Sequence, residues 1–250
     1  MPRLAVFVDD GGVMNDNKLR HHEWVRLVGE FFPPRLGGSA SDWSMANSKL
    51  VAGLWDRLLA DQARKGLVDT YHAWSRRYQL DWLAAMAGEV GVPLPEDEEE
   101  ALAIAIAAAE YVTSRCRSGF ADAPAAVRRL AASGHALHTA SGEESRELHG
   151  YLTGMGLRDY FGHLFGPDLV NAFKAGPVYY GRAFAYAGLE AGACVVVDDS
   201  PEALAWAAEA GAHTVLVDRD GTRRSRFAGY AIASLEELPA LVEELEATRP

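Results

Sequence analysis

The stretch R-L-A-V-F-V-D-D-G-G-V-M-N-D, residues 3–16, decides the fold of this chain. Its first part, residues 3–8, is a continuous apolar run of the kind that lies buried on both faces of a parallel sheet. The run stops at Asp9, Asp10, Gly11 and Gly12, where carboxylates and glycines favour a loop. The stretch therefore predicts a buried strand that delivers Asp9 to the edge of a sheet.

Three more apolar runs of strand length appear only in the second half of the chain, at residues 136–139, 194–197 and 214–217. Helical patterns accompany them near Pro124 and at residues 143–154, 177–187 and 201–210. This alternation predicts an α/β fold with a Rossmann-like parallel sheet, whose ligand site lies at the carboxyl ends of the strands. Asp9, Thr139 and Asp198 all stand at such ends.

Residues 17 to about 117 follow a different pattern, with a repeat of 3.6 residues and no run typical of a strand. Helices are expected at residues 19–32, 43–59, 69–90 and 96–115, and the expected breakers are Pro33-Pro34, Gly37-Gly38, Gly66 and residues 91–95. The sequence therefore predicts an α/β core domain of residues 1–16 and 117–250. An α-helical domain of residues 17–116 would be inserted into it.

Charge and composition exclude several classes of partner. The formal net charge is -11 and the 24 Lys and Arg residues are scattered, which argues against binding to nucleic acid or to an anionic membrane. Two cysteines, Cys116 and Cys194, are too few for a disulfide framework, and no targeting segment or membrane-spanning stretch is evident. We expect a cytoplasmic protein that acts on a small molecule, and its oligomeric state is left open.

Four pieces of sequence need a joint explanation: Asp9 in V-D-D-G-G-V, Thr139 in L-H-T-A-S, Lys174 in N-A-F-K, and Asp198-Asp199 in V-V-V-D-D-S-P-E. In this order the sequence resembles the haloacid dehalogenase superfamily of hydrolases, in the subgroup that carries a helical cap after the first motif. Asp16, the spacing of 24 positions from Lys174 to Asp198, and G-L-R-D-Y-F at residues 156–161 add to the resemblance.

The resemblance implies that Asp9 attacks phosphorus and forms an aspartyl-phosphate, which water then hydrolyses. Lys174 would neutralise phosphate oxygens, and the Thr139 hydroxyl would donate to the phosphoryl group. Mg²⁺ is the implied cofactor, because it prefers oxygen ligands. Its predicted ligands are Asp9, the Gly11 carbonyl, Asp199 and, through water, Asp198, while Gly12, Ala140 and Ser141 complete the predicted substrate-binding set.

Position 11 departs from the family pattern. Most phosphatases of the superfamily carry a second Asp two positions after the nucleophile, and this chain has Gly11 there. Asp10 is not a simple replacement, since adjacent residues leaving a strand project to opposite sides. Because general acid and base help is worth roughly 10² to 10⁴ in rate, its absence slows hydrolysis of alkyl phosphates without abolishing it.

Three interpretations follow from this departure. The favoured one is a Mg²⁺-dependent phosphatase that uses a cap residue, a water or the acidity of its own substrate. The second is chemistry without the acid, as in haloacid dehalogenases, or as in the phosphonate-cleaving branch, for which Lys18 or Lys49 is the candidate lysine. The third is a catalytically weak protein that captures a phosphorylated metabolite.

Residues just after the first motif are candidates for contacts with the substrate, because a cap domain closes over the active site. They are Asn15, Asn17, Arg20, His21, His22 and Glu23. His21 or His22 is the candidate for binding substrate and protonating the leaving group, since imidazole titrates near neutral pH. Arg20 and Arg26 are candidates for binding an anionic tail of the substrate.

Overall fold

A computed structural model describes residues 3–65, 68–223 and 225–248. Within these ranges one sheet has six strands, and all of its neighbouring pairs are parallel. The strands are β1 (Ala5–Val8), β2 (Leu137–Ala140), β3 (Phe161–Phe165), β4 (Cys194–Asp198), β5 (His213–Val217) and β6 (Tyr230–Ile232), in the spatial order β3-β2-β1-β4-β5-β6. The predicted parallel α/β fold is confirmed.

The sequence predicted four of these strands and missed β3 and β6. Gly162 and His163 in the middle of β3 are exposed, and β6 has two exposed residues out of three. Both strands form the edges of the sheet, so neither carries the continuous apolar run of a central strand. A search for such runs therefore finds the centre of the sheet and passes over its edges.

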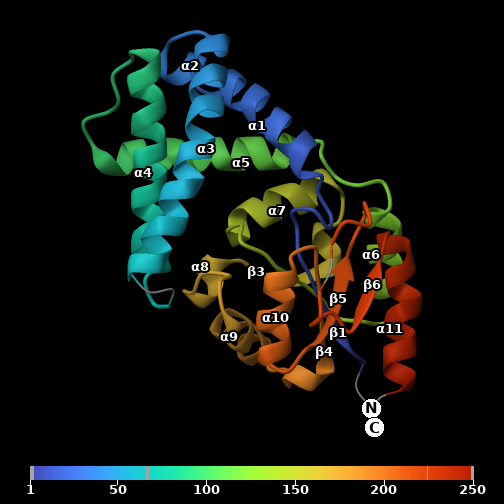
Figure 1. Cartoon of the computed structure of the whole chain (residues 1–250). Coiled ribbons are helices and arrows are strands. Elements are labelled where there is room, and N and C mark those ends of the chain that lie inside the picture. Colours follow the sequence, from blue (N-terminus) through green and yellow to red (C-terminus); the bar gives the residue numbers. More distant parts are fainter. Residues whose placement is uncertain (1–2, 66–67, 224, 249–250) are drawn as a thin grey trace.

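Helices cover both faces of the sheet (Figure 1). Val6 and Val8 of β1 belong to the apolar core formed with α6 (Ala123–Ala132), α7 (Ser145–Gly154) and α11 (Leu238–Ala247). Ala5 and Phe7 belong to the core formed with α9 (Pro177–Ala187) and α10 (Pro201–Glu209). This alternation follows the two-residue period of a strand. Shorter helical segments are α8 (Pro167–Val170), Arg158–Tyr160, Ala191–Ala193 and Leu235–Glu237.

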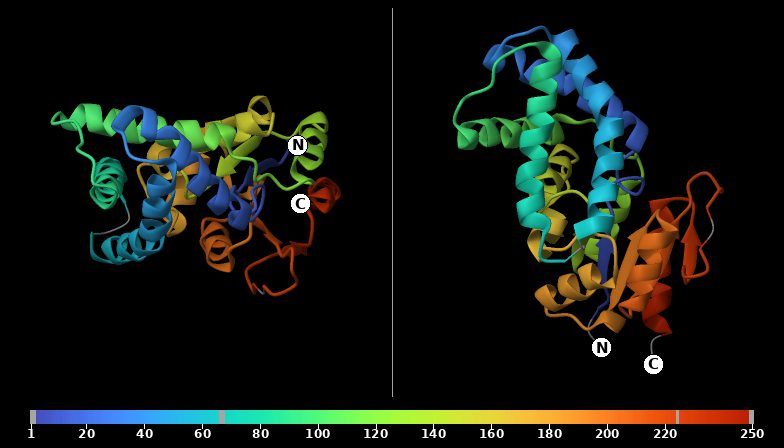
Figure 2. Two further views of the ribbon diagram at one scale, coloured as in Figure 1. Left: turned by 90° about the horizontal axis from the view of Figure 1, so that it is seen from above. Right: turned by 60° about the vertical axis from the view of Figure 1, so that its left-hand side comes forward.

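A second group of helices stands to one side of the sheet, as the views in Figure 2 also show. It consists of α1 (Asn17–Phe31), α2 (Pro33–Leu36), α3 (Ala40–Lys65), α4 (Tyr71–Val90) and α5 (Glu98–Arg115). These helices have an apolar core of their own, which includes Phe32, Trp43 and Leu83. The helical insertion into an α/β core is therefore present, while the exact domain boundaries stay a prediction.

Helix α7 joins the two parts of the molecule. Its Leu148 and Leu152 lie in the core beneath the sheet, whereas Tyr151 lies in the core of the helical insertion. Trp24 of α1 donates a hydrogen bond of 2.6 Å to the Tyr151 hydroxyl. Because α7 contributes side chains to both apolar cores, it holds the helical insertion against the α/β core.

Local signals explain several helix ends of the insertion. The Asp16 carboxylate caps α1 by accepting from the backbone amides of Lys18 and Leu19, at 2.7 and 3.2 Å. Gly91 ends α4 in the left-handed conformation, with φ of 78°. Pro33 and Pro34 end α1, as expected, but they also begin α2, since proline suits the first turn of a helix. Gly66 lies outside the described residues.

No helix in the described ranges is both long enough and apolar enough to cross a bilayer.

Candidate active site

Asp9 and Asp198 lie side by side at the carboxyl edge of adjacent strands. Val8 pairs with Val197 in the parallel ladder, and the Asp9 amide donates to the Val197 carbonyl at 2.9 Å. The chain extends the sheet from β1 through β2 and β3 on one side, and through β4, β5 and β6 on the other. The strand order reverses between β1 and β4, which is where open α/β sheets form a crevice.

Lys174, in the segment between α8 and α9, bridges these two carboxylates. Its Nζ lies 2.8 Å from Asp9 Oδ1 and 2.6 Å from Asp198 Oδ2, and none of the three side chains is more than 9% exposed. Burial by itself lowers the pKa of Lys174, but the attraction of Asp198 and Asp9 outweighs it and raises that pKa above its ordinary value. The ammonium group therefore stays charged at neutral pH and faces Asp9.

Asp199 completes a cluster of three carboxylates. One oxygen from each of Asp9, Asp198 and Asp199 lies within 4.8 Å of the others. Burial raises the pKa of Asp198 and of Asp199, and the proximity of Asp9 adds to both rises. Lys174 opposes the rise at Asp198, and Arg223, with a smaller contribution from Lys174, opposes it at Asp199. An additional cation among these oxygens would relieve that repulsion, and three carboxylate oxygens suit Mg²⁺. The predicted ligands Asp9, Asp198 and Asp199 thus come together, while the Gly11 carbonyl stays a predicted ligand.

Gly12 makes the close approach of Asp199 possible. A Cβ added at Gly12 would lie 2.0 Å from Asp199 Oδ2, and Gly12 has a φ of +81°, which other residues adopt with strain. The sequence predicted Gly12 as a substrate-binding residue. In the structure its observed neighbour is the carboxylate of the acidic cluster.

Arg223 contacts the cluster and was not predicted from the sequence. Its guanidinium forms an ion pair with the Asp199 carboxylate and donates to the Asp199 carbonyl oxygen at 2.8 Å. Arg223 comes after β5 in a polar loop, where an arginine has no pattern that separates it from a solvated side chain. Only the folding of the chain brings it to Asp199.

Asp10 points away from the cluster. Its fully buried carboxylate accepts from Asn15 Nδ2 at 2.6 Å and from Arg20 Nη1 at 2.9 Å. Burial raises the pKa of Asp10 to about 7, with Glu143 and Asp9 adding to the rise and Arg20 opposing it. Asp10 therefore anchors the loop of residues 9–16 and the start of α1.

Arg20 fills the space beside Gly11. Besides Asp10 it pairs with Glu143 at 3.2 Å, and it donates to Asn17 Oδ1 at 2.8 Å. A Cβ added at Gly11 would lie 2.8 Å from both Arg20 Nη2 and Asn17 Oδ1. The room that an aspartate at position 11 would need is thus taken by the guanidinium and by the Asn17 side chain.

The residues predicted around the phosphoryl group lie at the end of β2. Thr139 pairs with Val8, so Ala140 is level with Asp9 along the sheet edge. The Thr139 hydroxyl is buried and donates weakly to the Phe165 carbonyl at 3.4 Å. The Ser141 hydroxyl accepts from the Glu143 amide at 3.3 Å. The observed hydrogen bonds of both hydroxyls thus join backbone groups of the protein, and their role toward substrate stays a prediction.

The predicted histidines and lysines lie on the helical insertion. His21 and His22 are exposed on α1, with their ring centres 5.9 Å apart. Lys18 is also exposed. Lys49 pairs with Glu89 of α4 at 2.6 Å, so its ammonium already has a partner within the insertion. Arg26 likewise pairs with Glu23 and Glu30 on its own helix.

Solved structures with a similar fold include a phosphatase and a dehalogenase. A HAD phosphatase from Thermococcus onnurineus has 22% identity and a TM-score of 0.59, with 96% of this chain and 97% of that chain covered. The L-2-haloacid dehalogenase from Xanthobacter autotrophicus has 17% identity and a TM-score of 0.61, with coverage of 97% and 99%. The HAD-hydrolase YfnB from Bacillus subtilis, bound to magnesium, has 15% identity and a TM-score of 0.65, with coverage of 97% and 99%.

At these identities the likeness to solved structures concerns the fold alone. No curated protein matched the sequence. The sequence model of the haloacid dehalogenase-like hydrolases, however, matches residues 5–211, which run from β1 past the acidic cluster and include the whole helical insertion. This match spans most of the chain, and the chain therefore belongs to the haloacid dehalogenase-like hydrolases.

Proposed function

We propose that this protein is a Mg²⁺-dependent phosphatase that hydrolyses a small phosphorylated metabolite through an aspartyl-phosphate on Asp9. The observation that carries the proposal is the cluster of Asp9, Asp198 and Asp199 within 4.8 Å, with Lys174 bonded to two of its members. A site for uncharged or carboxylate substrates has no need of three carboxylates around one point. A site that binds a dianion through a cation does.

In the first step an Asp9 carboxylate oxygen attacks phosphorus, and the bond from phosphorus to the leaving-group oxygen breaks. Lys174, 2.8 Å from Asp9 Oδ1, orients the carboxylate and offsets the negative charge of the phosphoryl oxygens. In the second step water attacks the phosphorus of the aspartyl-phosphate. The products are inorganic phosphate and the regenerated Asp9 carboxylate.

Asp9 and Asp199, with Asp198 behind them, would hold the magnesium ion. When bound, it supplies the positive charge that lets an anionic nucleophile approach an anionic phosphate ester. Arg223 already pairs with Asp199, so the same carboxylate must release or share that guanidinium when it binds the ion.

Position 11 provides no acid that could protonate the leaving group. The nearest cation to that position, Arg20, cannot supply the proton, because an arginine stays protonated throughout the pH range of enzymes. The proposed substrates therefore have leaving groups that depart as stable anions, such as aryl, enol or acyl phosphates. Simple alkyl phosphates are expected to turn over slowly.

Turnover of p-nitrophenyl phosphate tests this proposal, with Mg²⁺ and with EDTA in its place. We expect turnover only with Mg²⁺, and loss of turnover in Asp9→Asn. Asp159→Asn, which changes an exposed aspartate outside the site, is the matched control and should retain turnover. Turnover that persists in Asp9→Asn, or that EDTA leaves unchanged, contradicts the proposal.

Two observations favour a second candidate, a dehalogenase-like reaction. Position 11 lacks the acid, and the Arg223 guanidinium pairs with Asp199 and so offsets part of the negative charge of the cluster. In this reaction Asp9 attacks the carbon that carries the halogen, the halide leaves without a proton, and water then hydrolyses the aspartyl ester to release a hydroxy acid. Release of halide from 2-chloropropionate in EDTA, lost in Asp9→Asn, would favour this candidate.

A third outcome of the same assays bears on the binding-protein interpretation. If the protein shows no turnover and no halide release but binds phosphate esters saturably, the result favours a protein that captures a phosphorylated metabolite. Calorimetry with p-nitrophenyl phosphate and Mg²⁺ on the Asp9→Asn variant measures that binding without turnover.

A further inference from the structure

Glu143 lies in the short segment between the end of β2 and the first turn of α7, close to position 11. Glu143 Oε1 is 3.2 Å from Arg20 Nη1, and the Glu143 side chain is 32% exposed. The other terminal nitrogen of the same guanidinium, Arg20 Nη2, lies 2.8 Å from a Cβ built on Gly11. A single guanidinium therefore links the Glu143 carboxylate to position 11.

Position 11 matters because of the second step of the reaction. In most phosphatases of the superfamily, the Asp two positions after the nucleophile protonates the leaving group and then takes a proton from the attacking water. Because Gly11 stands here, a carboxylate for this second task has to come from another element. Glu143 approaches from the end of β2, the strand next to β1, in which Thr139 pairs with Val8.

The surroundings of Arg20 connect Glu143 with the nucleophile. Burial by itself lowers the pKa of Arg20, while Glu143, Tyr151, Asp10 and Asp9 raise it above its ordinary value. The guanidinium thus lies within electrostatic reach of both Glu143 and Asp9. Of these four partners, Tyr151 and Asp10 are buried and Asp9 is the nucleophile, so Glu143 is the one whose carboxylate is free to meet solvent water.

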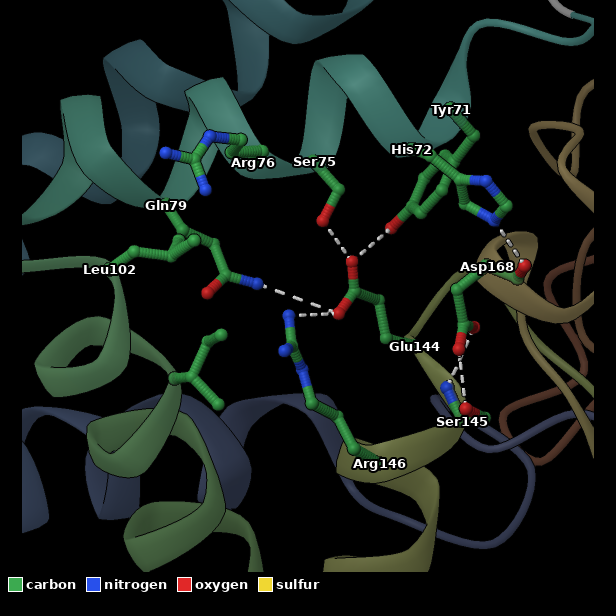
Figure 3. A pocket seen from close by; sticks show the side chains of 11 residues that line it. Tyr71, His72, Ser75, Arg76, Gln79, Leu102, Glu144, Ser145, Arg146 and Asp168 are labelled. Atoms are coloured by element: carbon green, nitrogen blue, oxygen red, sulfur yellow. Dashed lines mark hydrogen bonds and ion pairs between the residues drawn. The ribbon is translucent and has the colours of Figure 1, made fainter. Parts of the chain in front are cut away.

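The neighbouring Glu144 fixes the segment that carries Glu143. The buried Glu144 carboxylate accepts from the Tyr71 hydroxyl at 3.2 Å and from the Ser75 hydroxyl, both on α4. It also forms an ion pair with Arg146 of α7. Figure 3 shows these side chains converging on Glu144 in a pocket between the two helices. Glu144 therefore has a structural role, and it holds the adjacent Glu143 at a defined place beside Arg20.

Glu147 of α7 is the second acid next to Glu143. Burial raises the pKa of Glu147 well above its ordinary value, and the nearby carboxylates of Glu143 and Glu144 add to the rise. A hydrogen bond between the Glu147 and Glu143 side chains acts in the same direction. Of this pair Glu147 is thus the acid that retains a proton, and Glu143 is the carboxylate that faces Arg20.

We propose that Glu143 is the general base of the second step, a role that rests on the proposed phosphatase reaction. The Glu143 carboxylate takes a proton from the attacking water while the water oxygen bonds to phosphorus. The bond from phosphorus to the Asp9 oxygen breaks, and its electron pair returns to the Asp9 carboxylate. Glu143 then releases the proton to solvent. A leaving group that departs as a stable anion needs no proton, so Glu143 acts on the second step alone.

The test is stopped-flow and steady-state turnover of p-nitrophenyl phosphate with Mg²⁺ by Glu143→Gln. The amide oxygen of the new side chain can still accept from Arg20, but it takes up no proton. We expect a burst of up to one p-nitrophenolate per chain at the rate of the natural protein, followed by steady-state turnover lower by roughly 10² to 10⁴. Intact mass spectrometry after an acid quench should show the phosphorylated chain accumulating. The control is Glu209→Gln, an exposed glutamate at the end of α10, which should retain natural turnover.

The outcomes separate this inference from the proposed function. Steady-state turnover by Glu143→Gln within a few-fold of the natural protein overturns the inference and leaves the phosphatase reaction in place. A burst that is slowed as much as the steady state also overturns it, because Glu143 would then only hold Arg20. Natural protein without Mg²⁺-dependent turnover refutes the proposed function and this inference with it. If circular dichroism shows that Glu143→Gln is unfolded, Glu143→Asp decides, since its shorter carboxylate should give the same burst and a smaller fall in turnover.

Discussion

Arg20 holds its guanidinium where a side chain at position 11 would go: Arg20 Nη2 lies 2.8 Å from a Cβ built on Gly11. The same guanidinium pairs with Asp10 and Glu143, so it cannot swing aside without breaking two ion pairs. The absence of an acid at position 11 and the position of the Arg20 guanidinium therefore depend on each other. Gly11 makes room for Arg20, and Arg20 closes that room to an aspartate.

The first prediction concerns Gly11→Asp, the substitution that would restore the family pattern. We expect it to destabilise the protein by about 1–3 kcal/mol, because the new side chain displaces partners of the buried Asp10. Turnover of alkyl phosphates should not rise. Chemical denaturation and steady-state kinetics measure the two effects. The control is Gly181→Asp on α9, where an added Cβ meets nothing within 4 Å. A rise in alkyl phosphatase activity with unchanged stability would contradict the prediction.

The second prediction concerns the pH dependence of Arg20→Met. The pKa of Asp10 is about 7 in the folded protein against an ordinary value of 3.8, so the folded state binds more protons than the unfolded state between these values. The free energy of unfolding therefore falls as the pH rises through that window. Without Arg20, which lowers the pKa of Asp10, the fall should continue to a pH above 7.

Urea denaturation at pH 5 and at pH 8 measures this effect. Arg20→Met should cost about 3–5 kcal/mol at pH 8, where Asp10 is left as an unpaired buried charge, and clearly less at pH 5. The control is Arg26→Met, whose ion pairs on the same helix are solvent-exposed and should contribute little at either pH. The same loss for Arg20→Met at both pH values would show that Asp10 is not the group responsible.

The centre of the fold can be predicted from sequence, and the edges cannot. Buried parallel strands carry continuous apolar runs, so β1, β2, β4 and β5 are predictable, and their carboxyl ends bring Asp9 and Asp198 together. Edge strand β3, with exposed Gly162 and His163, carries no such signal. Cys194, at the start of the predicted strand of residues 194–197, is a buried free thiol at the first position of β4.

Contacts between distant segments are the other part that sequence reasoning missed. The pairing of Arg223 with Asp199 and the packing of Arg20 against Gly11 depend on loop paths that no local pattern encodes. The same holds for Glu144, which is buried and accepts a hydrogen bond from Tyr71 of α4. The order of the motifs along the chain predicted which carboxylates form the acidic cluster. Tertiary packing determines which cations lie around it.

The third prediction concerns Arg223→Met and Mg²⁺ binding. Because the guanidinium pairs with the Asp199 carboxylate, it competes with a cation for the same oxygens. Its side chain is 38% exposed, so the competing ion pair is weak, and we expect Mg²⁺ affinity to rise by roughly two- to fivefold when it is removed. Calorimetric titration with Mg²⁺ measures this. The control is Arg128→Met, which changes an exposed arginine on α6. A loss of Mg²⁺ affinity in Arg223→Met would contradict the prediction and would mean that Arg223 holds Asp199 in place.

The fourth prediction concerns Lys174→Met. The change removes the only protein cation that contacts both Asp9 and Asp198 within the described residues, so turnover should fall by a factor of about 10² or more. The carboxylates left behind repel one another more strongly, and Mg²⁺ can supply the missing charge. Saturating Mg²⁺ should therefore raise the melting temperature of Lys174→Met more than that of the natural protein. Differential scanning fluorimetry with and without Mg²⁺ measures the two increments. The control is Lys49→Met, which removes a lysine that pairs with Glu89 within the insertion, outside the site. Equal increments for Lys174→Met and the natural protein would mean that Lys174 and Mg²⁺ do not compensate the same negative charge of the cluster.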